Sequence, residues 1–129
     1  MTVYRPRWIA VLLLMVCSVT WATKPLPGWK ALGSSEIEDL FKGKVLGDGF
    51  HYSYRFQTNG SLSGVEMAKD VRGTWAVEKK LLCLHREKPR RFTECFEVHA
   101  NGRDINMLDR GGLVFRGNLL DLEPSQPIH

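Results

Sequence analysis

Recognisable catalytic and cofactor-binding motifs are lacking in this 129-residue chain. It has no phosphate-binding loop and no dinucleotide-binding glycine fingerprint. The segment GSLSG, residues 60–64, has the wrong order of residues for a nucleophile elbow, and no strand-to-helix turn surrounds it. The sequence therefore predicts no catalytic residue and no cofactor, and it favours a protein that is not an enzyme.

Cysteine is also scarce, because the chain has only Cys17, Cys83 and Cys95. A structural zinc site needs four convergent ligands, and no Cys-x-x-Cys or His-x-x-x-His spacing exists to supply them. Redox pairs usually sit close together at the start of a helix, whereas Cys83 and Cys95 are twelve positions apart. No metal site is predicted, and a redox role is disfavoured.

What the chain does have is a typical export signal at residues 1–22. Arg5 and Arg7 precede an uncharged apolar run from Trp8 to Ala22, and Ala22 suits a cleavage point. The run is shorter than the roughly 20 residues of a spanning helix, so a cleaved signal is favoured over an uncleaved anchor. A lipoprotein modified at Cys17 is a third option, but LMVC lacks the small residues expected before a lipidated cysteine.

Cleavage would change the charge balance. Without Arg5 and Arg7, 16 of the 18 basic residues remain against 14 acidic ones, so no broad nucleic-acid footprint is left. We expect a periplasmic or extracellular protein with no stable membrane span after cleavage, and nucleic acid is not expected as a partner. Two cysteines would remain, and an even number in an exported chain indicates a disulfide.

A short helix is predicted after an extended lead-in over residues 23–33, where Pro25 and Pro27 prevent regular structure. In SSEIEDLFKGK, Ser35 and Glu38 have the spacing of a capping box. Gly43 is a natural stop for the helix.

Beyond Gly43 the hydrophobic period changes to two. Phe50, Tyr52, Tyr54 and Phe56 alternate with polar residues, as in a half-buried strand. Asn59–Gly60 is a hairpin turn signal, and strands and turns then recur every 8–12 residues. Gly64 lies inside one of these strands and indicates a bulge or a close backbone approach. The sequence predicts one mainly β domain over residues 34–122, followed by a frayed tail over 123–129. Its fold is an antiparallel meander of about 6–7 strands, as a small barrel or a curled sheet, with one short N-terminal helix.

The two distal cysteines fall on neighbouring predicted strands. If the turn between those strands centres on Pro89, opposed residues have numbers that sum to about 178, and Cys83 faces Cys95. Opposed Cα atoms lie about 4.5–5.5 Å apart, within disulfide reach. A structural disulfide is therefore predicted, on the strand face that points away from Phe92 and Phe96.

The basic segment KPRR lies at the tip of the same hairpin. Lys88, Arg90 and Arg91 are normal residues for a solvated turn. The alternative is an anionic contact, with a phosphate-bearing or acidic envelope polymer as partner.

The order of four short motifs resembles a known family. These are Leu40–Lys44, Phe56–Gly60, Gly73–Val77, and Cys83 with Cys95. They resemble the family of small secreted proteobacterial proteins catalogued as domain of unknown function 995, over roughly residues 30–108. Lys79 and Lys80 depart from the acidic–glycine turn common in the family, and the C-terminal part does not match clearly. The resemblance implies a fold and a compartment but no activity.

Three function classes remain. The first is a non-catalytic module that binds a small ligand or an envelope protein, and the sequence favours it. The alternative is a small envelope hydrolase or another enzyme that uses scattered residues such as His51, His85 or Asp104. A purely structural envelope factor is a third class.

Overall fold

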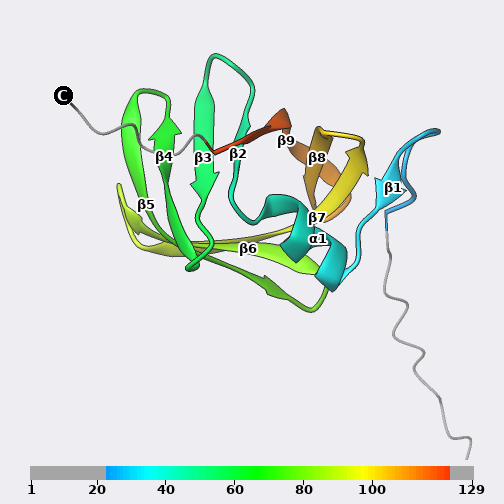
Figure 1. Cartoon of the computed structure of the whole chain (residues 1–129), viewed down its shortest axis with the longest axis horizontal. Coiled ribbons are helices and arrows are strands. Elements are labelled where there is room, and N and C mark those ends of the chain that lie inside the picture. Colours follow the sequence, from blue (N-terminus) through cyan, green and yellow to red (C-terminus); the bar gives the residue numbers. More distant parts are fainter. Residues whose placement is uncertain (1–22, 123–129) are drawn as a thin grey trace, which may run out of the picture.

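The structure is a computed structural model that describes residues 23–122. The predicted signal segment, Cys17 and the predicted tail lie outside these residues. The described part is a closed antiparallel β-barrel of eight strands, with one further strand and one short helix (Figure 1). The elements are, in order, β1 (Lys30–Ala31), α1 (Ser34–Phe41), β2 (Lys44–Gly47), β3 (Tyr52–Phe56), β4 (Ser61–Glu66), β5 (Lys69–Glu78), β6 (Leu81–Lys88), β7 (Phe92–Asn101), β8 (Asp104–Asp109) and β9 (Gly112–Asp121).

The barrel is an up-and-down meander closed by its first and last strands. Each strand from β2 to β9 pairs with the next one along the chain, and β9 returns to pair with β2. Lys44 lies opposite Asp121 at this closure, and their side chains form an ion pair of 3.2 Å. The sequence left open whether the meander is a barrel or a curled sheet, and the pairing of β2 with β9 makes it a barrel.

The predicted number of strands is slightly low because two short strands were missed. β2 has the sequence KVLG and follows the helix too closely to show an alternating pattern. β1 is a two-residue strand inside the lead-in, where Lys30 and Ala31 lie opposite Ala100 and His99 of β7. Both strands exist because of long-range pairing, which a local hydrophobic pattern does not reveal.

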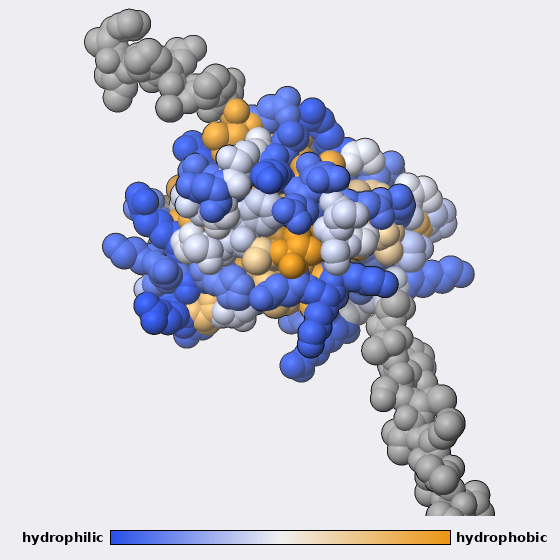
Figure 2. Space-filling view, turned by 60° about the horizontal axis from the view of Figure 1, so that its bottom comes forward, coloured by the Kyte–Doolittle hydropathy of each residue, from blue (hydrophilic) through white to orange (hydrophobic). Residues whose placement is uncertain are grey.

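Alternating inward-facing side chains fill the barrel. Tyr54, Phe56 and Trp75 are buried as predicted, and Phe56 makes edge-to-face contacts with Phe41 and Trp75 at 5.0 and 5.6 Å. Figure 2 shows one face of the molecule, where polar and charged side chains dominate and hydrophobic ones form a small central group and scattered points. This distribution follows from the packing of the apolar side chains inside the barrel.

Phe50 does not belong to this core, so its predicted place in the buried face of the strand is wrong. β3 begins at Tyr52, and Phe50 lies in the preceding loop with 93% of its surface exposed. The cause is Asp48, whose side chain accepts hydrogen bonds from the backbone N–H groups of residues 50–52 and so fixes the loop.

Helix α1 packs against one end of the barrel through Ile37 and Phe41, which are both buried. Its N-terminus is capped by Glu36, which accepts a hydrogen bond from the Gly33 N–H at 3.3 Å. A hydrogen bond from Lys30 and this contact with Gly33 lower the pKa of Glu36. The predicted Ser35–Glu38 capping box is therefore wrong, because the helix already begins at Ser34. No helix among residues 23–122 has the length and apolarity needed to cross a membrane.

Cys83 and Cys95 form the predicted disulfide. They lie directly opposite each other in the β6–β7 ladder, with Cα atoms 4.0 Å apart. Both alternate with the inward-facing Leu82, Leu84 and Phe96, so the cross-link is on the outer side of the ladder. The disulfide is compatible with an oxidising compartment.

Two strand glycines allow the backbones to approach closely inside the barrel wall. A Cβ atom on Gly64 would lie 2.0 Å from the carbonyl oxygen of Ser53, and one on Gly73 would lie 2.0 Å from that of His85. The close approach predicted at Gly64 is confirmed. The register shift of this region falls between Arg72 and Gly73, where β5 pairs with β6.

Candidate functional site

The barrel has a helix-covered end and an open end. α1 lies beside the β5–β6 turn, where the Lys80 N–H donates to Ser34 Oγ at 3.1 Å. Antiparallel neighbours place alternate connections at the same end. The β2–β3, β4–β5, β6–β7 and β8–β9 connections are therefore at the end away from the helix (Figure 1).

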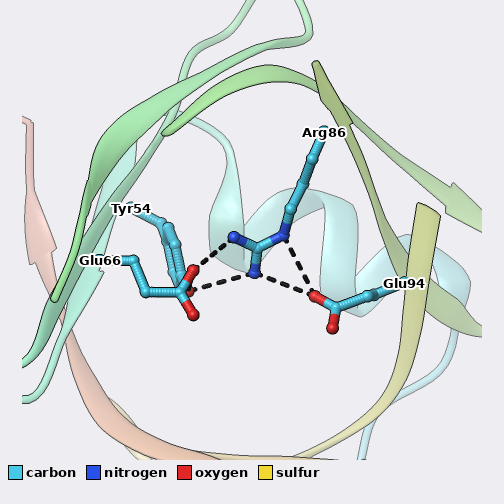
Figure 3. Close-up of polar contacts among 4 residues, drawn as sticks. All are labelled: Tyr54, Glu66, Arg86 and Glu94. Carbon is cyan, nitrogen blue, oxygen red and sulfur yellow. Dashed lines mark hydrogen bonds and ion pairs between the residues drawn. The ribbon is translucent and has the colours of Figure 1, made fainter. Parts of the chain in front are cut away.

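An arginine lies inside the barrel near this open end. Arg86 continues the inward-facing series Leu82 and Leu84 on β6, and only 3% of its surface is exposed. Its Nε and Nη2 atoms donate to Glu94 Oε2 at 3.1 and 2.9 Å. Nη1 donates to Glu66 Oε2, and Nη2 also donates to the Tyr54 hydroxyl at 3.2 Å. Figure 3 shows the guanidinium held between the two carboxylates.

The cluster fixes the protonation states of Arg86 and Tyr54. Burial opposes the charge on Arg86, but the hydrogen bonds that it donates to Tyr54 and Glu66, with the attraction of the Glu66 carboxylate, outweigh this effect and raise the pKa of the guanidinium. Burial raises the pKa of Tyr54, whose hydroxyl donates to Glu66 Oε2 at 2.9 Å. Arg86 is therefore a permanent cation and Tyr54 a neutral donor at physiological pH.

A cleft of about 430 Å³ opens above this cluster. Glu66 and Arg86 form its polar floor. Its remaining lining is apolar with two basic side chains: Met67, Val71, Pro89 and Phe92, with Lys69 and Arg90. The guanidinium carbons of Arg86 and Arg90 each lie 5.2 Å from the centre of the Phe92 ring. Cation–π contacts at this distance hold the aromatic ring in place.

The structure brings only one of the predicted anion-contacting residues to this cleft. Arg90 lines it, whereas Lys88 at the end of β6 and Arg91 in the β6–β7 connection are exposed beside it. The Glu78 carboxylate lies within 4.8 Å of the sulfurs of Cys83 and Cys95, but the disulfide leaves no thiolate to bind a metal ion there.

The residues considered for an enzyme occupy separate places. His85 lies on β6 and contacts Thr93 Oγ1 at 3.0 Å, and Asp104 begins β8. His51 belongs to the β2–β3 connection, where its Nδ1 lies 2.7 Å from Asp48 Oδ2. Among residues 23–122, His51, His85 and Asp104 share no hydrogen bond or ion pair.

Asp48 organises the β2–β3 connection around that contact. Its Oδ1 accepts hydrogen bonds from the N–H groups of Phe50 at 2.8 Å, His51 at 2.7 Å and Tyr52 at 3.2 Å. Desolvation acts to raise the pKa of Asp48, but these backbone bonds and the His51 contact outweigh it and hold the pKa well below its usual range. The loop is thus fixed by a carboxylate that stays ionised.

Sequence reasoning missed the cluster of Tyr54, Glu66, Arg86 and Glu94. A signal was present, because Arg86 follows Leu82 and Leu84 at alternate positions, and Glu94 lies between Phe92 and Phe96. A charged residue in the inward register of an otherwise apolar strand face indicates a buried pair. What the sequence did not show is which strands meet across the barrel.

Comparisons with known proteins add no relative. No family model matches the chain. No curated protein and no solved structure matches it either. The resemblance to domain of unknown function 995 therefore stays a prediction from sequence motifs, and function has to be argued from the site.

Proposed function

We propose that the protein is a non-catalytic binding module, and that the cleft at the open end of its barrel binds a small amphipathic ligand with an anionic group. The observation that carries this proposal is the buried Arg86 guanidinium, locked beneath an open cleft with apolar walls. The hydrogen bonds within the cluster hold the floor of the cleft rigid. A floor that is rigid before the ligand arrives favours binding.

The charges around the cleft support an anionic ligand. Glu66 and Glu94 together outnumber the single charge of Arg86, so the buried cluster does not itself attract an anion from solution. Lys69 and Arg90 are exposed at the rim and can approach an anionic group. The volume is within the roughly 300–1,000 Å³ typical of small-molecule sites.

The same proposal places the protein in the periplasm or outside the cell. The disulfide supports an oxidising compartment. Mass spectrometry of exported protein is expected to show a chain that starts near Thr23. A chain that retains residues 8–22, or a lipid on Cys17, would contradict the processing.

The binding proposal can be tested with 8-anilinonaphthalene-1-sulfonate, a small aromatic anion. In a titration followed by amide chemical shifts, the shifts should concentrate in residues 66–71 and 86–92. Phe92→Ala and Arg90→Gln should weaken binding, whereas the matched surface changes Leu120→Ala and Lys80→Gln should not. Shifts that concentrate elsewhere, or equal binding by all four variants, would sink the proposal.

A hydrolase is the second candidate because of the Asp48–His51 contact. Asp48 can fix the His51 tautomer through Nδ1, which leaves Nε2 available on a side chain that is 67% exposed. A second groove, of about 410 Å³, is lined by both His51 and Ser53, but these two residues share no hydrogen bond. A fluorophosphonate probe should label Ser53, and lose that label in His51→Ala, only if this candidate is correct.

A further inference from the structure

Two large hydrophobic side chains protrude from neighbouring connections at the open end. Phe50 in the β2–β3 connection is 93% exposed, and Met67 in the β4–β5 connection is 67% exposed. The connections are joined by a hydrogen bond of 2.7 Å from the Met67 N–H to the His51 carbonyl. Single exposed hydrophobic residues are ordinary on a protein surface, but an adjacent pair at loop tips is a feature that a partner can use.

The exposure of Phe50 is built into its loop. The carboxylate of Asp48 accepts hydrogen bonds from the backbone of Phe50 and of the two residues that follow. These bonds hold the backbone of residues 50–52 while the Phe50 side chain points to solvent. A fixed loop loses little conformational entropy when its exposed side chain is buried by a partner.

The rim around these two residues is basic. The connections at the open end and their flanking residues carry Lys69, Lys88, Arg90, Arg91 and Arg110. Asp48 and Asp109 are the acids of the same connections, apart from Glu66, which pairs with Arg86. The helix-covered end is balanced, because Glu36, Glu38, Asp39, Glu78 and Asp104 face an equal number of basic residues there: Lys42, Lys44, Lys79, Lys80 and Arg103. The open end therefore has an excess of basic residues, five against three acids, and it is also the end with the protruding hydrophobic residues.

From this combination we infer that the open end of the barrel docks on an anionic lipid surface. Phe50 and Met67 enter the headgroup region, and the basic rim contacts the lipid phosphates. Aromatic side chains are favoured at a membrane interface, and each lysine or arginine near an anionic surface adds to the affinity. The inference concerns the tips of the connections and goes beyond the proposed ligand cleft that they surround.

A lipid surface fits these observations better than a second copy of the chain. A symmetric contact between two open ends would bring two basic rims together. Anionic lipid instead neutralises the rim and accepts the hydrophobic tips at the same time. A membrane contact also needs no complementary pocket, and two protruding side chains are enough to start insertion.

The test uses exported protein whose N-terminus, read by mass spectrometry, begins at or after residue 23, so that the apolar segment 8–22 does not contribute. Vesicles of equal parts phosphatidylcholine and phosphatidylglycerol should bind the protein in a flotation assay, and pure phosphatidylcholine vesicles should bind it much less. Phe50→Ser/Met67→Ser should lower the partition coefficient about tenfold or more. Lys88→Gln/Arg91→Gln should lower it about tenfold, and about 0.5 M sodium chloride should have a similar effect.

Matched controls separate end-on docking from general stickiness. Leu120→Ser removes an exposed hydrophobic side chain from the barrel wall, and Lys79→Gln/Lys80→Gln removes two charges at the opposite end. Both should bind like the parent. Absent binding to the anionic vesicles, or binding that Phe50→Ser/Met67→Ser retains, would overturn the inference. Equal losses of vesicle binding in the control variants would also overturn it. The same holds for a dimer that forms in lipid-free buffer and that Phe50→Ser/Met67→Ser converts to a monomer.

Discussion

Glu94 accepts two hydrogen bonds from one guanidinium, that of Arg86, through Nε at 3.1 Å and Nη2 at 2.9 Å. Both bonds end on Oε2 of the carboxylate, and each is a charge-assisted hydrogen bond, which is stronger than a bond between neutral groups. Because Glu66 holds the remaining terminal nitrogen, Arg86 joins β4 to β7 across the barrel.

Removal of both carboxylates, those of Glu66 and Glu94, should therefore lower the free energy of unfolding more than removal of the Arg86 guanidinium. Glu66→Gln/Glu94→Gln leaves a buried charge without a counter-ion, which we expect to destabilise the fold by about 3 kcal/mol. Arg86→Met replaces the cation by an apolar side chain and leaves two carboxylates that are about one-third exposed and can be hydrated. Urea unfolding should show Arg86→Met as the more stable variant, and the reverse order would contradict this account of the cluster.

The disulfide should stabilise the barrel without taking part in ligand binding. Cys83→Ser/Cys95→Ser should lower the free energy of unfolding by about 2–4 kcal/mol, since the cross-link restricts the unfolded chain. Binding of 8-anilinonaphthalene-1-sulfonate by the folded variant should stay unchanged, because the disulfide is on the outer side of the β6–β7 ladder. Thiol titration of denatured, unreduced protein that begins at or after residue 23 should find no thiol. Two titratable thiols would refute the pairing.

Trp75 should be one of the most sensitive positions of the core. It packs edge-to-face on Phe56, and its indole Nε1 donates to the Gln57 carbonyl at 2.9 Å. Trp75→Ala should cost about 3–5 kcal/mol through lost contacts and a cavity. Leu120→Ala, at an exposed wall position, should stay within about 0.5 kcal/mol of the parent. A loss below about 1 kcal/mol for Trp75→Ala would mean that the tryptophan is not core.

Alkaline pH should unfold the barrel through its buried tyrosines. Burial, together with the negative charge of Asp48, raises the pKa of Tyr52 to about 12, and burial raises the pKa of Tyr54 as well. The unfolded tyrosine has a pKa of about 10, so the unfolded chain loses these protons first and stability falls as pH rises from about 10 towards 12. Tyrosinate absorbance should appear together with unfolding. Ionisation of both tyrosines near pH 10 in folded protein would contradict the burial.

The β2–β3 connection should depend on a single carboxylate. Asp48→Ala removes the acceptor of three backbone hydrogen bonds, so amide exchange at Phe50, His51 and Tyr52 should accelerate. Asp48→Asn keeps an oxygen that can accept those bonds and should preserve much of the protection. Equal acceleration in both variants would indicate that the charge, and not the acceptor, fixes the loop.

The sequence predicts those parts of the fold that a local pattern controls. Tyr52, Tyr54 and Phe56 alternate because β3 has one buried face, and the Cys83–Cys95 pairing follows from a short hairpin. Phe50 continues the same alternation but is exposed, because the side chain of Asp48 turns the backbone before the strand begins. A hydrogen bond from a side chain to its neighbouring backbone thus overrides the hydrophobic pattern.

The candidate site depends on distant pairing and could be predicted only in part. Arg86 and Glu94 occupy inward positions that the alternation of their strands identifies. They contact Glu66 and Tyr54 only because the whole barrel wall is curved. Gly64 and Gly73 contribute to this curvature, because they let neighbouring strand backbones approach closely. The closure of the barrel depends likewise on the pairing of β2 with β9. These strands are at opposite ends of the domain, so a local sequence pattern cannot show that they pair.

The pairing of β9 with β2 also gives the barrel an order of completion. β9 (residues 112–121) pairs with both β2 and β8. Until β9 has folded into the barrel, β2 and β8 therefore each have an edge of unpaired backbone groups. Such edges are templates for pairing with other chains. A chain cut short before β9 would therefore keep most of its hairpins and yet be prone to aggregate, and the C-terminal strand is the segment that ends this vulnerability during folding.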